Sequence, residues 1–206
     1  AGTNGGAITR CWATGDVAGE AFDGGGLVGE NNPPGTIDNS YATGSVTGPW
    51  AGAGGLTGYN KGMITNCYAV GQVSGAGDVG GLVGLPGAKE LPVNSFWDVQ
   101  TSGQSQSKGG TGKTTAQMQT AQTFLDASWD FDDVWNIVEG ETYPFLRLGL
   151  VADLTCDGRV DLRDYARLAA NWSKTCSYTK PKSPTVMCPL AGDLTGDREV
   201  NTQDLR

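Results

Sequence analysis

Apolar and polar positions alternate in short runs along the first half of the chain, and one run recurs. It reads Ile37-Asp38-Asn39-Ser40-Tyr41-Ala42-Thr43-Gly44-Ser45-Val46, with further copies from Ile8 and Ile64 and a degenerate copy from Val93. The starting positions 8, 37, 64 and 93 lie 29, 27 and 29 residues apart. Such alternation predicts half-buried β-strands, and a repeat of this length predicts stacked units that bury their apolar faces against one another.

A second, glycine-rich element precedes the later runs. It reads Gly26-Leu27-Val28-Gly29 and returns as Gly55-Leu56-Thr57-Gly58 and Gly81-Leu82-Val83-Gly84. Of the 33 glycines in the chain, 28 precede Lys113, and this density disfavours helices because each interior glycine costs about 1 kcal/mol. Glycine suits tight corners and close backbone contacts instead. We therefore expect a mainly β fold, a β-solenoid whose coils of 27–29 residues stack Ile, aromatic and Val side chains into ladders.

The recurring run and the glycine-rich element together resemble the GLUG-motif repeats of bacterial surface proteins. The resemblance covers roughly residues 1–150. GLUG proteins end their repeats with a Trp-rich segment containing Tyr-Pro-x-Leu, which is similar to Tyr143-Pro144-Phe145-Leu146 here. The resemblance therefore implies GLUG-like solenoid repeats over residues 1–112 and a C-terminal solenoid cap over residues 113–150, with the cap aromatics buried. The same Trp and Tyr side chains could instead stack on sugar rings.

Between the repeats and the predicted cap, residues 99–115 are rich in Gly, Ser and Thr and predict a loop that leaves the last coil. Gly109-Gly110-Thr111-Gly112-Lys113-Thr114 looks at first like a phosphate-binding loop. The full motif requires a glycine where Ser107 stands, and no α/β strand leads into it, so we expect no nucleotide site. Thr114 or Thr115 is predicted to cap a short helical turn through Met118.

Charge and composition limit the function classes. The chain has 14 basic and 22 acidic residues and no histidine, so it lacks the basic surface that nucleic acids require and the commonest general base and zinc ligand. No apolar run approaches the roughly 20 residues of a membrane helix, which predicts no membrane insertion. Because the repeats offer only scattered carboxylates, we expect no enzyme activity, with a polysaccharide-active β-helix enzyme as the less favoured alternative. These carboxylates are Asp16, Asp23, Glu30, Asp38 and Asp78.

The five cysteines fall into two groups. Cys11 and Cys67 hold the same repeat position two coils apart, about 9–10 Å if coils stack at ~4.8 Å, which is too far for a disulfide. Cys176 and Cys188 flank a Pro-rich segment and could close a loop, with Cys156 as a competing partner of either.

Residues 151–206 contain two candidate calcium-binding loops. The first, residues 153–164, places oxygen donors at positions 1, 3, 5, 9 and 12 and Gly158 at position 6, the spacing of an EF-hand loop. An amphipathic helical pattern follows it. This loop predicts a Ca²⁺ site with the ligands Asp153, Thr155, Asp157, Arg159 (through its carbonyl), Asp161 and Asp164.

The second loop, residues 193–204, repeats the donor spacing but has Arg198 at position 6. A left-handed backbone at a residue other than glycine costs about 1–2 kcal/mol, so we expect a weaker site. Its predicted ligands are Asp193, Thr195, Asp197, Glu199, Asn201 and Asp204.

The paired loops resemble type I dockerin modules, which implies a small α-helical Ca²⁺-binding module and a cohesin-like partner. The pattern departs from that family at Thr155, where Asn or Asp is usual, and at the cysteine-flanked insert over residues 173–192. The sequence also stops at Arg206, before the second helix, which puts ordinary cohesin docking in doubt.

Together these features predict a non-catalytic structural or adhesive protein of an extracellular or cell-surface location in a bacterium. The chain opens inside a repeat and ends just after the second calcium loop, before the helix that would complete the module. We expect either a fragment or a chain whose neighbours cover both ends, giving a head-to-tail homopolymer that forms a surface filament. The alternative is a dockerin-bearing component anchored to a cohesin-type scaffold.

Overall fold

The computed structural model describes residues 2–19, 23–48, 51–87 and 91–147, together with Arg163 and Ala166. The chain forms two compact units, Ala1–Trp129 and Asp130–Arg206. None of the helices in the described residues is long and apolar enough to span a membrane.

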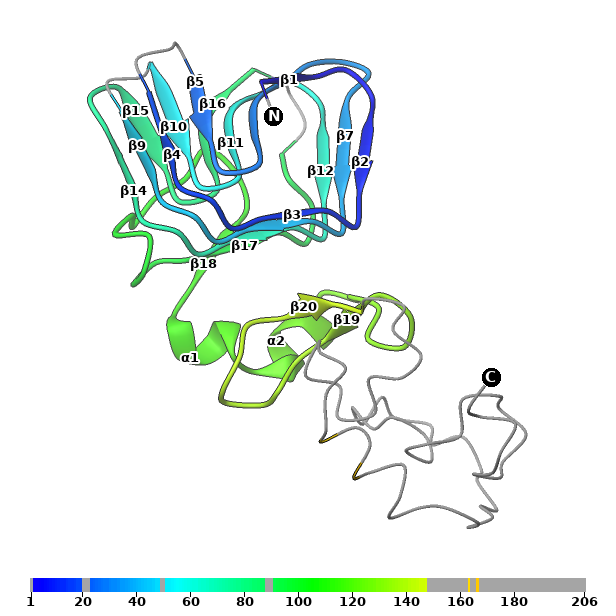
Figure 1. The fold of residues 1–206 in the computed structure, drawn as a ribbon. Helices are drawn as coiled ribbons and strands as arrows, with labels where there is room; N and C mark the ends of the chain where they lie inside the picture. Colours follow the sequence, from blue (N-terminus) through cyan, green and yellow to red (C-terminus); the bar gives the residue numbers. More distant parts are fainter. Residues whose placement is uncertain are drawn as a thin grey trace. The chain divides into compact units, whose positions relative to one another are not determined.

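The first unit is a β-solenoid in which the backbone turns through short strands and returns to the same course one coil later (Figure 1). Each coil contributes up to five strands, joined by corners rich in glycine. Coil 1 contains β1 (Thr3–Asn4), β2 (Ala7–Thr9), β3 (Trp12–Ala13) and β4 (Val17–Ala18); coil 2 contains β5 (Asp23–Gly25), β6 (Val28–Asn31), β7 (Thr36–Asp38), β8 (Tyr41–Ala42) and β9 (Val46–Gly48). Coil 3 contains β10 (Gly52–Gly54), β11 (Thr57–Asn60), β12 (Met63–Thr65), β13 (Tyr68–Ala69) and β14 (Val73–Gly75); coil 4 contains β15 (Asp78–Gly80), β16 (Val83–Pro86) and β17 (Phe96–Asp98).

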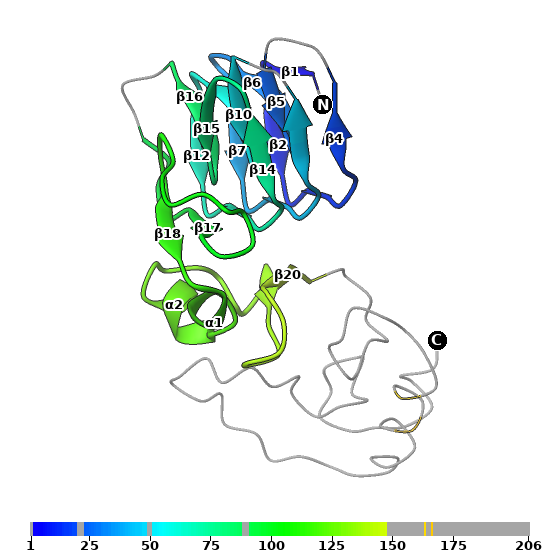
Figure 2. The same cartoon turned by 90° about the vertical axis from the view of Figure 1, so that its left-hand side faces the viewer.

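Equivalent strands of successive coils pair in parallel and form five sheets. Sheet A has the order β1-β6-β11-β16, sheet B β12-β7-β2, sheet C β18-β17-β13-β8-β3, sheet D β14-β9-β4 and sheet E β15-β10-β5. The register confirms the predicted ladders, since Ile8 pairs with Ile37 and Ile37 with Ile64. Figure 2, turned by 90°, shows the coils side by side along the solenoid. The predicted mainly β solenoid is therefore confirmed.

The interior is filled by these ladders. The largest cluster joins Leu27, Leu56 and Leu82 at the glycine-rich corner with Ile37 and Ile64 from sheet B, and all five are buried. A smaller cluster of valines and alanines fills the space between sheets D and E. Because each ladder position contacts its counterparts in the coils before and after it, burial depends on having a neighbour on both sides.

The recurring glycines let sheets E and A approach backbone to backbone. A Cβ atom at Gly25 would lie 2.0 Å from the Val28 carbonyl oxygen, and at Gly54 it would lie 2.0 Å from the Thr57 carbonyl oxygen. No side chain fits at that distance. The glycine preceding each Gly-Leu-x-Gly element is therefore required by the tight corner that joins the two sheets.

The segment after coil 4 differs from the predicted loop. It returns along the end of the solenoid: the Val73 amide donates to the Ser102 carbonyl at 3.0 Å, and the Gly81 amide donates to the Gln106 carbonyl at 3.0 Å. The segment then continues into β18 (Thr111–Lys113), which extends sheet C in parallel with β17. The prediction of a loop that leaves the last coil is thus wrong, because the polar side chains and backbone of this segment satisfy the hydrogen bonds of the last coil's edge.

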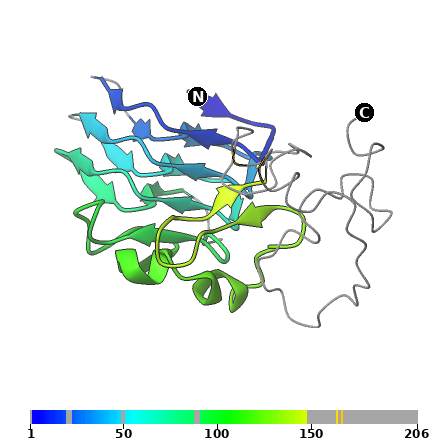
Figure 3. The ribbon, with the colours of Figure 1, turned by 60° about the horizontal axis from the view of Figure 1, so that its bottom comes forward.

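Two short helices follow, α1 (Thr115–Met118) and α2 (Ala121–Leu125). The Thr114 side chain accepts a hydrogen bond from the Gln117 amide, and the Gln117 side chain accepts one from the Thr114 amide, forming a capping box. This confirms the predicted helical turn through Met118. In Figure 3, both helices lie at the green end of the stack of coils.

The described part of the second unit contains an antiparallel pair, β19 (Trp135–Asn136) and β20 (Phe145–Leu146). Trp135 is fully buried and Phe131 nearly so. The Arg147 guanidinium donates to the carbonyls of both residues, at 3.1 Å to Trp135 and 3.0 Å to Phe131. Burial is thus confirmed for Phe131 and Trp135, whereas Tyr143 and Phe145 are half-buried. The boundary between the two compact units lies at Trp129, inside the predicted cap of residues 113–150.

Candidate functional site

The predicted calcium ligands lie outside the described residues, so both metal sites stay predictions. The same holds for Cys156, Cys176 and Cys188. Where the first loop is predicted to pass into its helix, Arg163 and Ala166 are described, and both are helical and exposed.

The carboxylates of the solenoid are dispersed over several faces. Asp38 lies on β7 in sheet B and Asp78 on β15 in sheet E, while Asp16 lies between β3 and β4. Hydrogen bonds from Ser45 lower the pKa of Asp16. Within the described ranges, no three acidic, cysteine or histidine residues are grouped so that they could hold a metal ion.

Asp23 and Glu30, on β5 and β6, interact electrostatically with each other. Burial raises the pKa of Asp23, and the nearby charge of Glu30 raises it further. The Glu30 carboxylate accepts a hydrogen bond from the Asn32 side-chain amide at 3.0 Å. This local pair occupies one corner of coil 2 and has no counterpart in coil 3, where Gly52 and Tyr59 stand in register.

Cys11 and Cys67 are free thiols in the same row of sheet C, separated by Ser40. The Ser40 hydroxyl accepts a hydrogen bond from the Cys11 amide at 3.1 Å and donates one to the Asp38 carbonyl at 2.8 Å. Burial raises the pKa of the Cys67 thiol, whereas Cys11 is exposed. The row is therefore a ladder of small side chains.

A ladder of buried asparagines was not predicted. The Asn4 side-chain amide donates to Asn31 Oδ1 at 2.9 Å, and the Asn31 amide donates to Asn60 Oδ1 at 2.8 Å. Asn60 ends the ladder by donating to the Gly62 carbonyl. The signal in the sequence is the recurrence of Asn shortly before each Ile of the run, but coil 2 has two extra residues there, which shifts the spacing.

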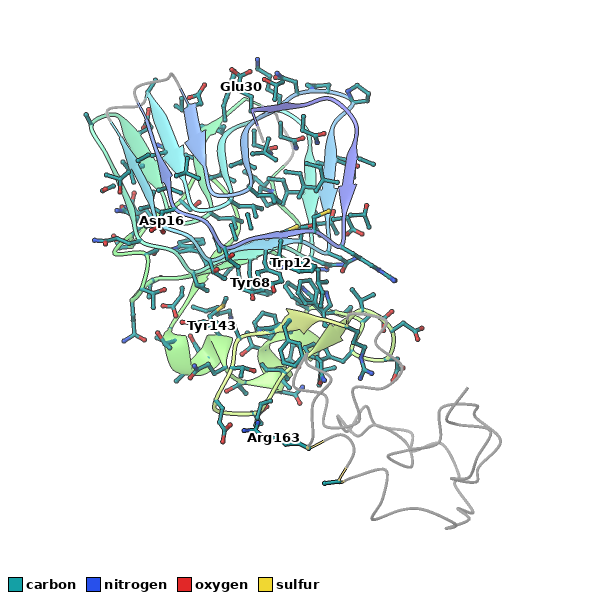
Figure 4. The ribbon with its side chains drawn as sticks, viewed as in Figure 1. Trp12, Asp16, Glu30, Tyr68, Tyr143 and Arg163 are labelled. Atoms are coloured by element: carbon teal, nitrogen blue, oxygen red, sulfur yellow. The ribbon has the colours of Figure 1, made fainter. Side chains whose placement is uncertain are left out.

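Aromatic side chains form a row on the outer face of sheet C. The rings of Trp12 and Tyr41 stack with centroids 6.4 Å apart, and those of Tyr41 and Tyr68 stack 4.9 Å apart. Figure 4 shows Trp12 and Tyr68 projecting from the side of sheet C away from the solenoid interior. Phe96 continues the register after Tyr68, so the row runs through all four coils, which the recurring aromatic position predicts.

The C-terminal part of this row is covered by the segment after β18. Phe124 of α2 packs edge-on against Phe96 with centroids 5.4 Å apart, and Trp129 lies 6.3 Å from Tyr68. The Trp129 indole nitrogen also donates to the Asn94 carbonyl at 2.8 Å. As a result, Tyr68 is 1% exposed, whereas Trp12, at the other end of the row, is 46% exposed.

Coil 1 is the outermost coil in the described part of the chain. β1, β2, β3 and β4 are the outermost strands of sheets A, B, C and D, and within the described part of the chain nothing pairs with their outer edges. The contrast with covered coils is direct at one position: a Cβ at Gly44 would lie 2.0 Å from the Gly15 carbonyl oxygen, but a Cβ at Gly15 would meet no atom within 4 Å.

Comparison with known proteins identifies a repeat family and two relatives. Residues 21–47 match the family described as the GLUG motif. A protein of Evansella cellulosilytica named as a Gly-rich membrane protein is 46% identical over 88 residues, which is 40% of this chain and 10% of that protein. Halomucin of Haloquadratum walsbyi is 36% identical over 85 residues, 39% of this chain and 1% of that protein. No solved structure matches the chain.

The GLUG resemblance expected from the sequence is therefore supported for the repeats. The chain spans a tenth or less of the length of the curated relatives it matches.

Proposed function

We propose that the protein is a non-catalytic structural or adhesive component of an extracellular or cell-surface layer, in which the β-solenoid is a spacer and residues 151–206 form a Ca²⁺-dependent assembly module. The non-catalytic spacer role is supported mainly by the filled solenoid. Its interior is occupied by stacked ladders of side chains, and its outer aromatic row is largely covered. Similarity to a Gly-rich membrane protein and to halomucin agrees with a surface role.

We further propose how copies of the chain are joined to one another. The parallel coils give the solenoid a direction, and units with a direction can assemble head to tail through unlike surfaces. In this arrangement a neighbouring subunit covers the edge of coil 1, and the two predicted calcium loops order the joint because Ca²⁺ binding stabilises the folded loop. The result is a homopolymer. If the calcium module instead binds a cohesin-like domain, the protein is anchored to a foreign scaffold.

The test is particle size against Ca²⁺ concentration, by light scattering with negative-stain images. We expect reversible growth into fibres at about 0.1–1 mM Ca²⁺, the range of extracellular calcium modules, and dissociation on chelation. The double variant Asp157→Asn, Asp197→Asn should stay monomeric, whereas Asp132→Asn, an exposed carboxylate outside the loops, should grow like the wild type. Monomers that bind Ca²⁺ without growing would contradict the filament, and Ca²⁺-dependent capture of a cohesin domain would then support the anchoring alternative.

A further inference from the structure

We propose that residues 102–108, the edge strap, form an autoinhibitory contact. The edge strap occupies the hydrogen-bonding edge of coil 4 and so keeps a second copy of this chain from pairing with that edge. It lies inside the chain, between the strands β17 and β18. The inference goes beyond the proposed function and does not depend on the calcium module.

Ser107 takes the place of a backbone carbonyl of a further coil. At each Gly-Leu-x-Gly corner, two neighbouring amides of one coil share the carbonyl of the leucine in the next coil. The amides of Leu27 and Val28 donate to Leu56 at 3.0 and 3.2 Å, and those of Leu56 and Thr57 donate to Leu82 at 2.9 and 3.1 Å. In coil 4, the amides of Leu82 and Val83 both donate to Ser107 Oγ, at 3.2 and 2.9 Å. A side-chain hydroxyl thus reproduces the acceptor that the earlier coils receive from their neighbours.

Gln104 and the backbone of the edge strap imitate a further coil in sheet D. In the covered coils, the Val46 amide donates to the Gln72 carbonyl of the following coil at 2.8 Å. The Val73 amide finds the same kind of acceptor in the Ser102 carbonyl, at 3.0 Å. The Gln104 side chain then donates to the Val73 carbonyl at 2.8 Å. The edge of β14 at Val73 is therefore satisfied by one backbone carbonyl and one side-chain amide.

The edge strap closes the edge of coil 4 without offering a new one. Tyr41, Tyr68 and Phe96 are in register in sheet C at spacings of 27 and 28 residues, whereas Thr111 follows Phe96 after 15 residues. On this shorter path the strap reads Ser-Gly-Gln-Ser-Gln-Ser-Lys, contains no apolar side chain and forms no strand. Within the described residues, sheets A, D and E therefore end at β16, β14 and β15. Because an exposed sheet edge is a template for pairing with another chain, a cover of this kind prevents such pairing.

Polar contacts hold the strap on the edge. Besides the hydrogen bonds of Ser107 and Gln104, Lys108 forms an ion pair with Asp78 of β15 at 3.4 Å, and both side chains are about half exposed. Exposed ion pairs contribute little to stability, and each hydrogen bond contributes modestly. Substitution of Ser107 and Gln104 should therefore release the strap while the apolar interior of the coils stays in place.

The partner that fits the released edge is a second copy of this chain. β16 is the last strand of the four-stranded sheet A and already pairs in register with β11 on its inner side. Two copies related by a two-fold axis would pair β16 with β16 in antiparallel orientation and join their sheets A into one continuous sheet. A two-fold interface uses the same surface on both copies and is complete with two. The expected product is therefore a dimer and not a fibre.

The test compares two double variants of the full chain that remove the same residue types from the strap. Ser107→Ala with Gln104→Ala removes the side chains that bind the edge, whereas Ser105→Ala with Gln106→Ala removes exposed side chains of the same strap. Sedimentation velocity is measured over about 1–100 μM, where species with unpaired strand edges begin to associate. A chelator in all samples excludes Ca²⁺-dependent growth. We expect the first double variant to shift from monomer to dimer with concentration and the second to stay monomeric like the wild type.

Hydrogen exchange at the lowest concentration shows whether the edge has been released. Without the Ser107 hydroxyl, the amides of Leu82 and Val83 should exchange about tenfold faster, while exchange in β7, between β2 and β12 in sheet B, should stay unchanged because the solenoid remains folded. Faster exchange at Leu82 and Val83 without dimers would overturn the proposed partner, and unchanged exchange there would overturn the role of Ser107. Fibres, or dimers of both double variants, would equally overturn the proposal.

A single variant decides the case in which the double variant also exchanges faster in β7. Gln104→Ala removes one side-chain hydrogen bond to Val73 and keeps the Ser107 contacts. Dimers of this variant at the highest concentration would support the strap as an autoinhibitory contact, and monomers throughout would overturn it.

Discussion

The two ends of the solenoid carry the same repeat and have opposite environments. At the C-terminal end, residues 102–108 and β18 complete the hydrogen bonds of the last coil, and Phe124 and Trp129 cover the aromatic row. At the other end, no described strand pairs with the outer edges of the coil 1 strands. Equivalent positions therefore differ in burial, as Cys11 and Cys67 do. In a solenoid, the environment of a residue is set by the coils on either side of it more than by its own sequence.

The largest effect should come from removing the aromatic cover at the closed end. Trp129 is 3% exposed, packs against Phe124 with centroids 4.7 Å apart and donates a hydrogen bond to Asn94. We expect Trp129→Ala to lower the free energy of unfolding by about 3–5 kcal/mol, the cost of a large buried-to-small change. Trp12→Ala, at the exposed end of the same row, should cost less than about 1 kcal/mol.

Urea denaturation monitored by circular dichroism compares the two tryptophan variants directly. Equal losses for Trp12→Ala and Trp129→Ala would contradict the difference between the two ends. They would mean that coil 1 is covered in solution as fully as the last coil.

Gly71 and Gly15 occupy the same row of the repeat and test the difference between a covered coil and coil 1 at the backbone. A Cβ at Gly71 would lie 1.8 Å from the Gly44 carbonyl oxygen of the adjacent coil, whereas Gly15, two coils earlier in the same row, faces open space. Gly71→Ala should destabilise the solenoid by about 1–3 kcal/mol because the coils must separate locally to admit the methyl group. Gly15→Ala should change stability by no more than about 0.5 kcal/mol.

The readout for the glycine pair is the urea midpoint, together with hydrogen exchange of β13 and β14. Faster exchange there in the Gly71 variant would show that the coils separate at the substituted position. Should Gly15→Ala also destabilise the chain, an additional layer must lie on coil 1 in solution.

The features that could be predicted from the sequence are those whose pattern recurs from one coil to the next. The period, the Ile ladder and the aromatic row follow from alternation, and the helical turn at Thr114 follows from its capping residues. The closure of the last coil could not be predicted, because residues 102–108 have no apolar period and their role arises from hydrogen bonds to distant strands. The asparagine ladder was missed because coil 2 is longer ahead of Ile37. The calcium ligands, including Asp153 and Asp193, remain predictions.

The residue at the corner before sheet C has the same left-handed backbone conformation in all four coils, but it is Arg in coil 1 and Asn in the other three. Asn39, Asn66 and Asn94 have φ values of 47°, 51° and 49°, and Arg10, at the same place in coil 1, has a φ value of 52°. The left-handed region costs most residues about 1–2 kcal/mol, and asparagine is among those that enter it most readily because its short side chain bonds locally. Coil 1 thus carries a strain that the three later coils avoid.

The smallest predicted effect follows from this difference. Arg10→Asn should raise the free energy of unfolding by about 0.5–1 kcal/mol, part of the left-handed cost that Arg pays, and should slow hydrogen exchange in β2 and β3. The reciprocal change Asn66→Arg, in a covered coil, should lower the free energy of unfolding by at least as much. If Arg10→Asn has no effect while Asn66→Arg destabilises, the corner of coil 1 is relaxed in solution.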